Sequence, residues 1–154
     1  AQSVAKLTCT DIDAPTISDN ASRLAFVKNL SFEYFDFRQG GYPASVDAVY
    51  CVDVIEHVFQ TEEQVFLSNI FACLNQHGIG IVGTPNQTAE QYASENSMKG
   101  HVNLKNHRSL RSLMEQHFHR VFLFSMNDEV IHTGYYPMAH YLWALGVGRR
   151  LVEP

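Results

Sequence analysis

The residues from Val46 to Val52 read VDAVYCV, a nearly unbroken apolar run that one acid interrupts. A short run of this kind is typical of a strand that is buried on both faces of a parallel sheet. Parallel strands need long crossovers, usually helices, to join them, so the run predicts an alternation of strands and helices along the chain. Glu56 and His57 follow closely, which places two chemically active side chains just beyond the carboxyl end of this strand.

Other segments carry matching signals. Three segments carry signals for the start of a helix: Asp13 with Pro15, the capping-box pattern from Thr61 to Gln64, and Asn106. Gly78 is expected to end the second of these helices. In order, the predicted elements are strand 6–10, a helix to about residue 27, strands 31–37 and 46–52, a helix from 61, strand 79–82, a helix from 106, and strands 121–124 and 141–147. The last two strands are predicted to pair antiparallel. The expected fold is α/β, with a mostly parallel sheet and a C-terminal antiparallel hairpin.

Composition narrows the classes of partner and location. A chain of 154 residues with 45% hydrophobic content predicts one domain over residues 1–154. The formal net charge is −5 and the 11 Lys and Arg residues are dispersed, which argues against a nucleic-acid partner. Cys9, Cys51 and Cys73 lie in apolar runs without a C-x-x-C pair, as expected of free thiols in the cytoplasm. No apolar stretch approaches the ~18 residues of a membrane span.

Gly78, Gly80 and Gly83 spell the G-x-G-x-x-G pattern of dinucleotide-binding loops. Such glycines act where a strand ends and a helix begins, because the amides of the helix end then meet the pyrophosphate. Here they lie at the start of and within an apolar strand, and Thr84-Pro85-Asn86 ends the segment without a helical pattern. The motif is therefore not interpreted as a nicotinamide-binding site.

Two acids follow the first two predicted strands, at the edge where open α/β sheets bind ligands. Asp11 can accept two hydrogen bonds from a ribose diol or can cap the following helix, although Asp13 is the better candidate for the cap. Asp36 can accept from the exocyclic amine of adenine, with Phe37 as an apolar neighbour, or can start a turn.

Three features together carry a family resemblance: the segment VDAVYCVDVIEHV at residues 46–58, the segment GIGIVGTPN at 78–86, and the spacing of the two upstream acids. In these features the chain resembles class I S-adenosylmethionine-dependent methyltransferases, especially the ubiquinone-biosynthesis-like branch. The resemblance implies a Rossmann-like methyltransferase sheet, S-adenosylmethionine as cofactor and enzymatic methyl transfer. It assigns cofactor binding to Asp11 and Ile12 at the ribose, Asp36 and Phe37 at adenine, and Val52 and Asp53 along the methionine and methyl group. It also places His101 and Asn103 beside the acceptor pocket.

One part of the family pattern is absent. The first strand and its glycine-rich loop should precede Ala1, so we expect an N-terminally truncated sheet in which the first two visible strands lack their central neighbour. Each ladder amide or carbonyl left buried without a partner costs about 1 to 3 kcal/mol. A non-catalytic methyltransferase-like binding or scaffold domain is therefore the alternative to an enzyme.

The expected reaction is transfer of a methyl group to the oxygen, or to a nitrogen or carbon, of a small-molecule acceptor. An oxygen acceptor must lose a proton, and His57 is the candidate base because imidazole titrates near neutral pH. The alternative is that His57 only hydrogen-bonds a neighbouring loop. The aromatic tail around Tyr135, Tyr136, Tyr141 and Trp143 can line the acceptor pocket, pack in the core or form a homodimer. Tyr135 is the predicted acceptor contact from this tail.

The eight histidines raise the question of a metal site. The spacings of His101, His107, His117 and His119 match no zinc pattern, so no metal is predicted. His117 and His119 lie near the end of a predicted helix, where positive charge would favour the helix dipole.

Overall fold

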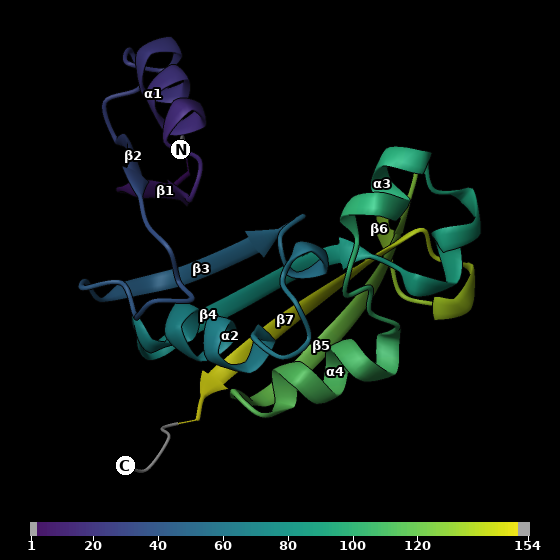
Figure 1. The fold of residues 1–154 in the computed structure, drawn as a ribbon. Helices are drawn as coiled ribbons and strands as arrows, with labels where there is room; N and C mark the ends of the chain where they lie inside the picture. The colour runs from purple at the N-terminus through teal and green to yellow at the C-terminus, as the bar shows by residue number, and fades with distance from the viewer. Residues whose placement is uncertain (1–2, 151–154) are drawn as a thin grey trace. The chain divides into compact units, whose positions relative to one another are not determined.

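The structure, a computed structural model, describes residues 3–150. Strands and helices alternate along most of the chain, as Figure 1 shows, so the predicted α/β fold is confirmed. The chain divides into two compact units, Ala1–Gly40 (unit 1) and Gly41–Pro154 (unit 2). The single domain expected over residues 1–154 stays a prediction.

Unit 1 consists of two parallel strands and the helix between them. Its elements are β1 (Leu7–Asp11), α1 (Ala14–Arg23) and β2 (Leu30–Tyr34). Asp13 caps α1, as predicted, by accepting a hydrogen bond from the backbone amide of Thr16 at 3.1 Å. The helix ends before the predicted Val27, because the chain turns there and the amide of Val27 donates to the carbonyl of Leu24 at 2.9 Å.

Unit 2 contains a five-stranded mixed sheet in the order β3-β4-β7-β5-β6. The strands are β3 (Val46–Val52), β4 (Leu74–Pro85), β5 (Phe118–Asn127), β6 (Val130–His132) and β7 (Tyr141–Arg149). β3 and β4 are parallel, whereas β7 runs antiparallel to both β4 and β5. The predicted antiparallel pairing of the last two long strands is confirmed. Across residues 3–150, β1–β2 and the five-stranded sheet are separate sheets, which agrees with the expected gap.

Two helices of unit 2 lie on the same face of this sheet, as Figure 1 shows. They are α2 (Glu63–Ala72) and α4 (His107–Glu115). Leu67, Phe71 and Leu110 point from them into the core, and Leu142 and Ala144 of β7 are buried from the sheet side. Alternate residues of β7 point to the opposite face and are half-buried, which is the two-residue period of a strand.

The helix boundaries test the capping predictions. Asn106 caps α4 as expected, and Ser109 completes a reciprocal capping box. The box predicted at Thr61 to Gln64 is wrong, because α2 begins at Glu63 and its N-cap Glu62 makes no side-chain capping bond. Gly78 does not end α2 either. The helix stops at Ala72, and β4 starts two residues later, so Gly78 lies inside a strand.

The glycines of the rejected dinucleotide pattern all belong to β4, as expected. Their role is steric. A Cβ on Gly80 would lie 2.5 Å from the ring of Phe118 and 2.7 Å from that of Phe71, closer than atoms can approach. Gly83 faces the other way, and a Cβ there would lie 2.9 Å from the ring of Trp143. The glycines thus make room for aromatic rings on both faces of the sheet.

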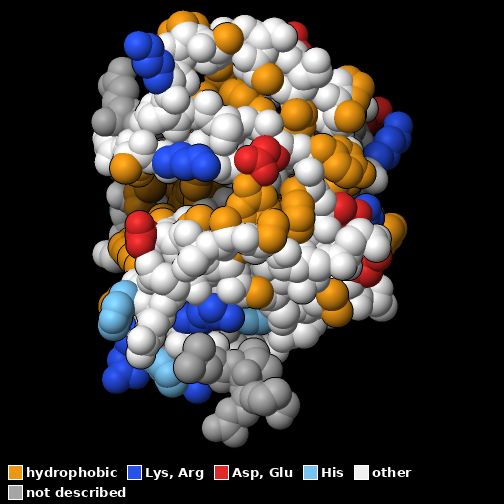
Figure 2. Space-filling view, turned by 90° about the vertical axis from the view of Figure 1, so that its left-hand side faces the viewer, with side chains coloured by type: hydrophobic (Ala, Val, Ile, Leu, Met, Phe, Trp, Pro, Cys, Tyr) orange, Lys and Arg blue, Asp and Glu red, His pale blue; other side chains and the backbone are white. Residues whose placement is uncertain are grey.

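The part of the chain that the structure describes also contains four shorter helices: η1 (Ile55–His57), η2 (Gln87–Tyr92), α3 (Glu95–Gly100) and η3 (Tyr136–Met138). No helix among residues 3–150 is long and apolar enough to cross a bilayer. Apolar side chains nevertheless reach the surface in many places, for example at Tyr50 and Phe59, and Figure 2 shows many hydrophobic side chains exposed on one face. The three cysteines are free thiols, as predicted.

Candidate functional site

Asp11 is the last residue of β1 and has an exposed side chain. One carboxylate oxygen accepts from the backbone amide of Asp13 at 2.8 Å, and the backbone carbonyl of Asp11 accepts from Phe35 at 3.0 Å. Because Asp13 caps the helix, the Asp11 carboxylate retains capacity for a ligand. Ile12 follows it with 54% of its surface exposed.

Asp36 lies two residues beyond β2, at the same end of the small sheet as Asp11. Sequence reasoning missed its partner. The guanidinium of Arg38 donates two hydrogen bonds of 2.9 Å to the two carboxylate oxygens, and these bonds lower the pKa of Asp36. Phe37 packs edge-on against Phe35 with ring centroids 4.8 Å apart. Asp36 therefore stays ionised, and any adenine amine would share its oxygens with Arg38.

Asp53 follows β3 in an unusual backbone conformation. Its φ is +53°, a region that residues with a Cβ seldom occupy. Its amide donates to the carbonyl of Gly83 at 3.1 Å, and its Oδ1 accepts from the hydroxyl of Tyr141 at 2.9 Å. The residue before it, Val52, continues the parallel ladder opposite Gly83. At the end of β3, Gly83 thus holds the backbone of Asp53 and Tyr141 holds its carboxylate.

Glu56, His57 and His101 form the most concentrated chemical group of unit 2. The Glu56 side chain is only 1% exposed and accepts from the hydroxyl of Thr84 at 3.1 Å, and burial raises the pKa of Glu56. The other Glu56 oxygen lies 4.0 Å from Nε2 of His57. The rings of His57 and His101 meet edge-on, with centroids 5.2 Å apart.

The hydrogen bond of His57 defines its tautomer. Nδ1 lies 2.9 Å from the carbonyl oxygen of Gly100, and since a carbonyl only accepts, Nδ1 carries the proton. The alternative in which His57 bonds a neighbouring loop therefore holds for Nδ1. In the neutral ring Nε2 keeps a lone pair on the side of Glu56, where it can take a proton or ligate a metal.

One ligand atom from each of Glu56, His57 and His101 lies within 4.8 Å of the others, a set that could hold a metal ion. A carboxylate and two imidazoles suit zinc and other divalent transition metals. Sequence spacing did not indicate this set, because His101 reaches it from a distant loop. The amides of Val102 and Asn103 donate to the Glu56 carbonyl at 2.9 and 3.0 Å and bring the loop in.

Comparisons with known proteins identify the family of the chain and its fold. A family model of the methyltransferase domain matches residues 1–82, which is more than half of the chain. The chain belongs to the methyltransferase domain family. No curated protein sequence matches it.

Solved structures support the methyltransferase fold. The chain is similar to the N-methyltransferase NodS of Bradyrhizobium japonicum WM9 in complex with S-adenosyl-L-homocysteine, with a TM-score of 0.67 and 14% identity over 93% of this chain and 66% of NodS. It is similar to the methyltransferase domain of bacterial CtHen1, with a TM-score of 0.71 and 16% identity over 96% of this chain and 80% of that one. It is also similar to magnesium protoporphyrin IX methyltransferase from Synechocystis PCC 6803, with a TM-score of 0.63 and 16% identity over 95% of this chain and 66% of that one. The chain thus spans just under two thirds of the length of NodS.

The segment of this methyltransferase domain that was expected to border an acceptor divides into two parts. His101 belongs to the cluster described above, whereas Asn103 is 7% exposed and internally bonded. The side-chain amide of Asn103 donates to the Glu63 carboxylate at 2.7 Å and accepts from the Lys105 ammonium at 2.7 Å. Lys105 also forms an ion pair with Glu63. This network anchors the segment to α2. Tyr135 is 71% exposed, next to η3, and its acceptor role stays a prediction.

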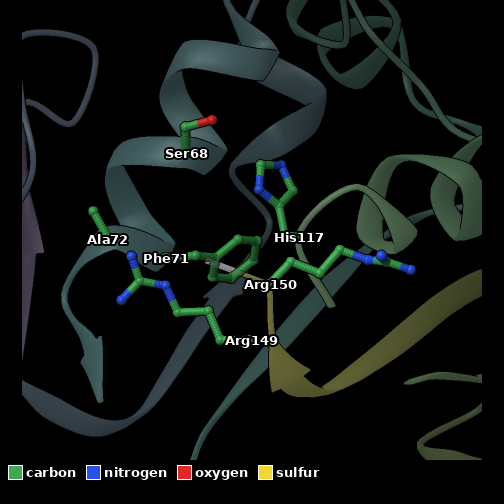
Figure 3. A pocket seen from close by; sticks show the side chains of 6 residues that line it. All are labelled: Ser68, Phe71, Ala72, His117, Arg149 and Arg150. Atoms are coloured by element: carbon green, nitrogen blue, oxygen red, sulfur yellow. The ribbon is translucent and has the colours of Figure 1, made fainter. Parts of the chain in front are cut away.

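A small pocket of the methyltransferase domain lies at the C-terminal end of α2. Figure 3 shows His117, Arg149 and Arg150 around it, and its volume is about 20 Å³, enough for roughly one water. The guanidinium of Arg149 donates to the carbonyl of Leu74 at 2.7 Å, and that of Arg150 donates to the carbonyl of Phe118 at 3.1 Å. The expectation that His117 serves as a cation at a helix end is wrong. The ring is 6% exposed, and burial lowers its pKa.

Proposed function

We propose that this protein transfers the methyl group of S-adenosylmethionine to a small-molecule acceptor, with an oxygen as the favoured target. The observation that carries the proposal is the family match over residues 1–82, which spans all the predicted cofactor contacts. NodS, which shares the fold, was solved with the demethylated product of this cofactor. Asp11 with Ile12 would hold the ribose, Asp36 with Phe37 the adenine, and Val52 with Asp53 the methionine end.

The transfer itself needs alignment more than covalent help. S-adenosylmethionine would supply an electrophilic methyl group: the acceptor oxygen would bond to the methyl carbon while the carbon–sulfur bond breaks and leaves its electron pair on sulfur, giving S-adenosylhomocysteine. Alignment and exclusion of water can lower such a barrier by about 7 to 11 kcal/mol at best. The acceptor proton must leave, and Nε2 of His57 is the base that we propose, with Glu56 at 4.0 Å to stabilise the imidazolium formed.

The distances within the Glu56, His57 and His101 cluster favour a second form of this chemistry. A divalent cation held by the three side chains would bind the acceptor hydroxyl and lower its pKa, so that the proton leaves more readily. We expect Zn²⁺ to raise the unfolding temperature of the wild-type protein and to leave that of the His101→Ala variant unchanged. His107→Ala, outside the cluster, is the matched control. Equal shifts in all three proteins would rule out the cation form.

Calorimetric titration of the full-length protein with S-adenosylmethionine and S-adenosylhomocysteine tests the proposal directly. We expect Asp11→Ala to raise the dissociation constant at least about tenfold, because the variant removes charge-assisted hydrogen bonds to the ribose. A tenfold change corresponds to about 1.4 kcal/mol of binding free energy. Asp19→Ala, an exposed acid of α1, is the control and should bind like wild type.

The outcomes separate the competing functions. Wild-type protein that binds neither compound would contradict the enzyme and support a methyltransferase-like binding or scaffold domain. Binding that Asp11→Ala leaves unchanged would remove only the ribose assignment. The neighbours include N-, carbon and porphyrin methyltransferases, so they do not choose among acceptors. Cytoplasmic location and a homodimer stay predictions.

A further inference from the structure

Asp53 needs support from its surroundings. A residue with a Cβ at φ +53° is strained, and such a conformation persists only where neighbouring contacts enforce it. The hydrogen bond from the backbone amide of Asp53 to the carbonyl of Gly83 extends the β3–β4 ladder by one residue and fixes the backbone. It does not fix the carboxylate, which is free to rotate unless a side chain holds it.

Tyr141 provides that contact from 88 residues further along the chain. It is the first residue of β7, and its hydroxyl donates to Oδ1 of Asp53 at 2.9 Å. Burial, and then the hydrogen bond to the Asp53 carboxylate, raise the pKa of Tyr141. The phenol therefore remains a protonated donor throughout the pH range in which proteins work.

The ring of Tyr141 is itself held in place. It packs against Trp143 with centroids 5.4 Å apart, and the indole nitrogen of Trp143 lies 3.3 Å from the sulfur of Met126. Gly83 makes room for both rings, since a Cβ there would lie 3.0 Å from Tyr141 and 2.9 Å from Trp143. Gly83 thus has two roles. Its carbonyl accepts a hydrogen bond from the backbone amide of Asp53, and its lack of a Cβ leaves room for the Tyr141 ring that holds the Asp53 carboxylate.

We propose that Tyr141 is a positioning residue for the methyl donor, an inference that rests on the proposed function. By occupying Oδ1, it orients the Asp53 carboxylate so that Oδ2 accepts a charge-assisted hydrogen bond from the ammonium group of the cofactor's methionine moiety. In this role Tyr141 acts on the donor through the Asp53 carboxylate, which its hydroxyl contacts.

A double-mutant cycle on the affinity for S-adenosylmethionine tests this in the full-length protein. Tyr141→Phe removes one oxygen and keeps the ring, and we expect it to raise the dissociation constant about five- to tenfold, the size expected for the net loss of one hydrogen bond. Asp53→Asn should weaken binding more. In the Asp53→Asn background, Tyr141→Phe should have no further effect, because the carboxylate that it orients is gone.

Tyr136→Phe is the matched control, because its hydroxyl bonds the carbonyl of Leu123 at 3.4 Å and not Asp53. It should bind like wild type. Tyr141→Phe that binds like wild type, or that weakens binding equally with and without the Asp53 carboxylate, would overturn the inference and leave the proposed function standing. Wild-type protein without affinity for S-adenosylmethionine would overturn both.

Discussion

His117 shows how a single side chain can differ from what its place in the sequence indicates. It comes just after α4, where a charged histidine would favour the dipole, yet its ring is 6% exposed and packs against Phe71 with centroids 5.3 Å apart. Its Nε2 has no hydrogen-bond partner among residues 3–150. Burial disfavours the charged form of the ring and lowers the pKa of His117.

This burial predicts a pH dependence of stability. The folded pKa of His117 lies below the unfolded value, so the unfolded chain binds more protons in the window between them. The histidine therefore costs no stability above the unfolded pKa of about 6.5. Stability falls as the pH drops below that value toward the folded pKa. We expect His117→Asn, which cannot be protonated, to lose less free energy of unfolding than wild type between pH 7.5 and pH 5.

Urea unfolding at several pH values measures this difference. His119→Asn is the control, because His119 lies two residues away with an exposed side chain and should track the wild-type curve. If the free energies of unfolding of wild type and His117→Asn changed in parallel with pH, the His117 ring would accept a proton in the folded state, and the prediction would be wrong.

At the scale of elements, the sequence predicts well where local signals are complete. The bounds of β3, Val46 and Val52, match the predicted strand, since its apolar run ends sharply on both sides. The predicted burial on both faces is wrong, because β3 is an edge strand of the five-stranded sheet and Cys51 is its one buried residue. Asn106 identifies α4, because both of its capping partners lie within three residues. β6 has three residues and pairs only with β5, so no periodicity is long enough to reveal it.

Contacts made across long sequence separations escaped prediction, and they decide the candidate site. Neither the Tyr141–Asp53 bond nor the approach of His101 to His57 follows from spacing, because each depends on how the strands and loops are arranged. Glu56 and His57 were recognisable from their place after β3. The burial of Glu56 became apparent only with Thr84 and the 101–103 segment around it.

The two units differ in how their apolar residues are buried. Every buried hydrophobic side chain among residues 3–150 belongs to unit 2, beginning with Cys51, whereas α1 of unit 1 buries none. Unit 1 therefore relies on its parallel ladder and on half-buried side chains. Because burial of apolar surface is the main favourable contribution to folding, the two units should open with different free energies.

Hydrogen exchange of this 154-residue chain should reveal the difference. We expect the amides of β1 and β2 to exchange at least about a hundredfold faster than those of β4 and β7, equivalent to a gap of about 2.7 kcal/mol in opening free energy. β7 pairs on both sides and carries the buried Leu142 and Ala144, so its amides should open only with the whole of unit 2. β6, a short edge strand of unit 2, is an internal control that should exchange fast despite belonging to the stable unit. Equal protection of β1 and β7 would mean that the two units unfold together, and that the stability of unit 1 comes from contacts beyond its own core.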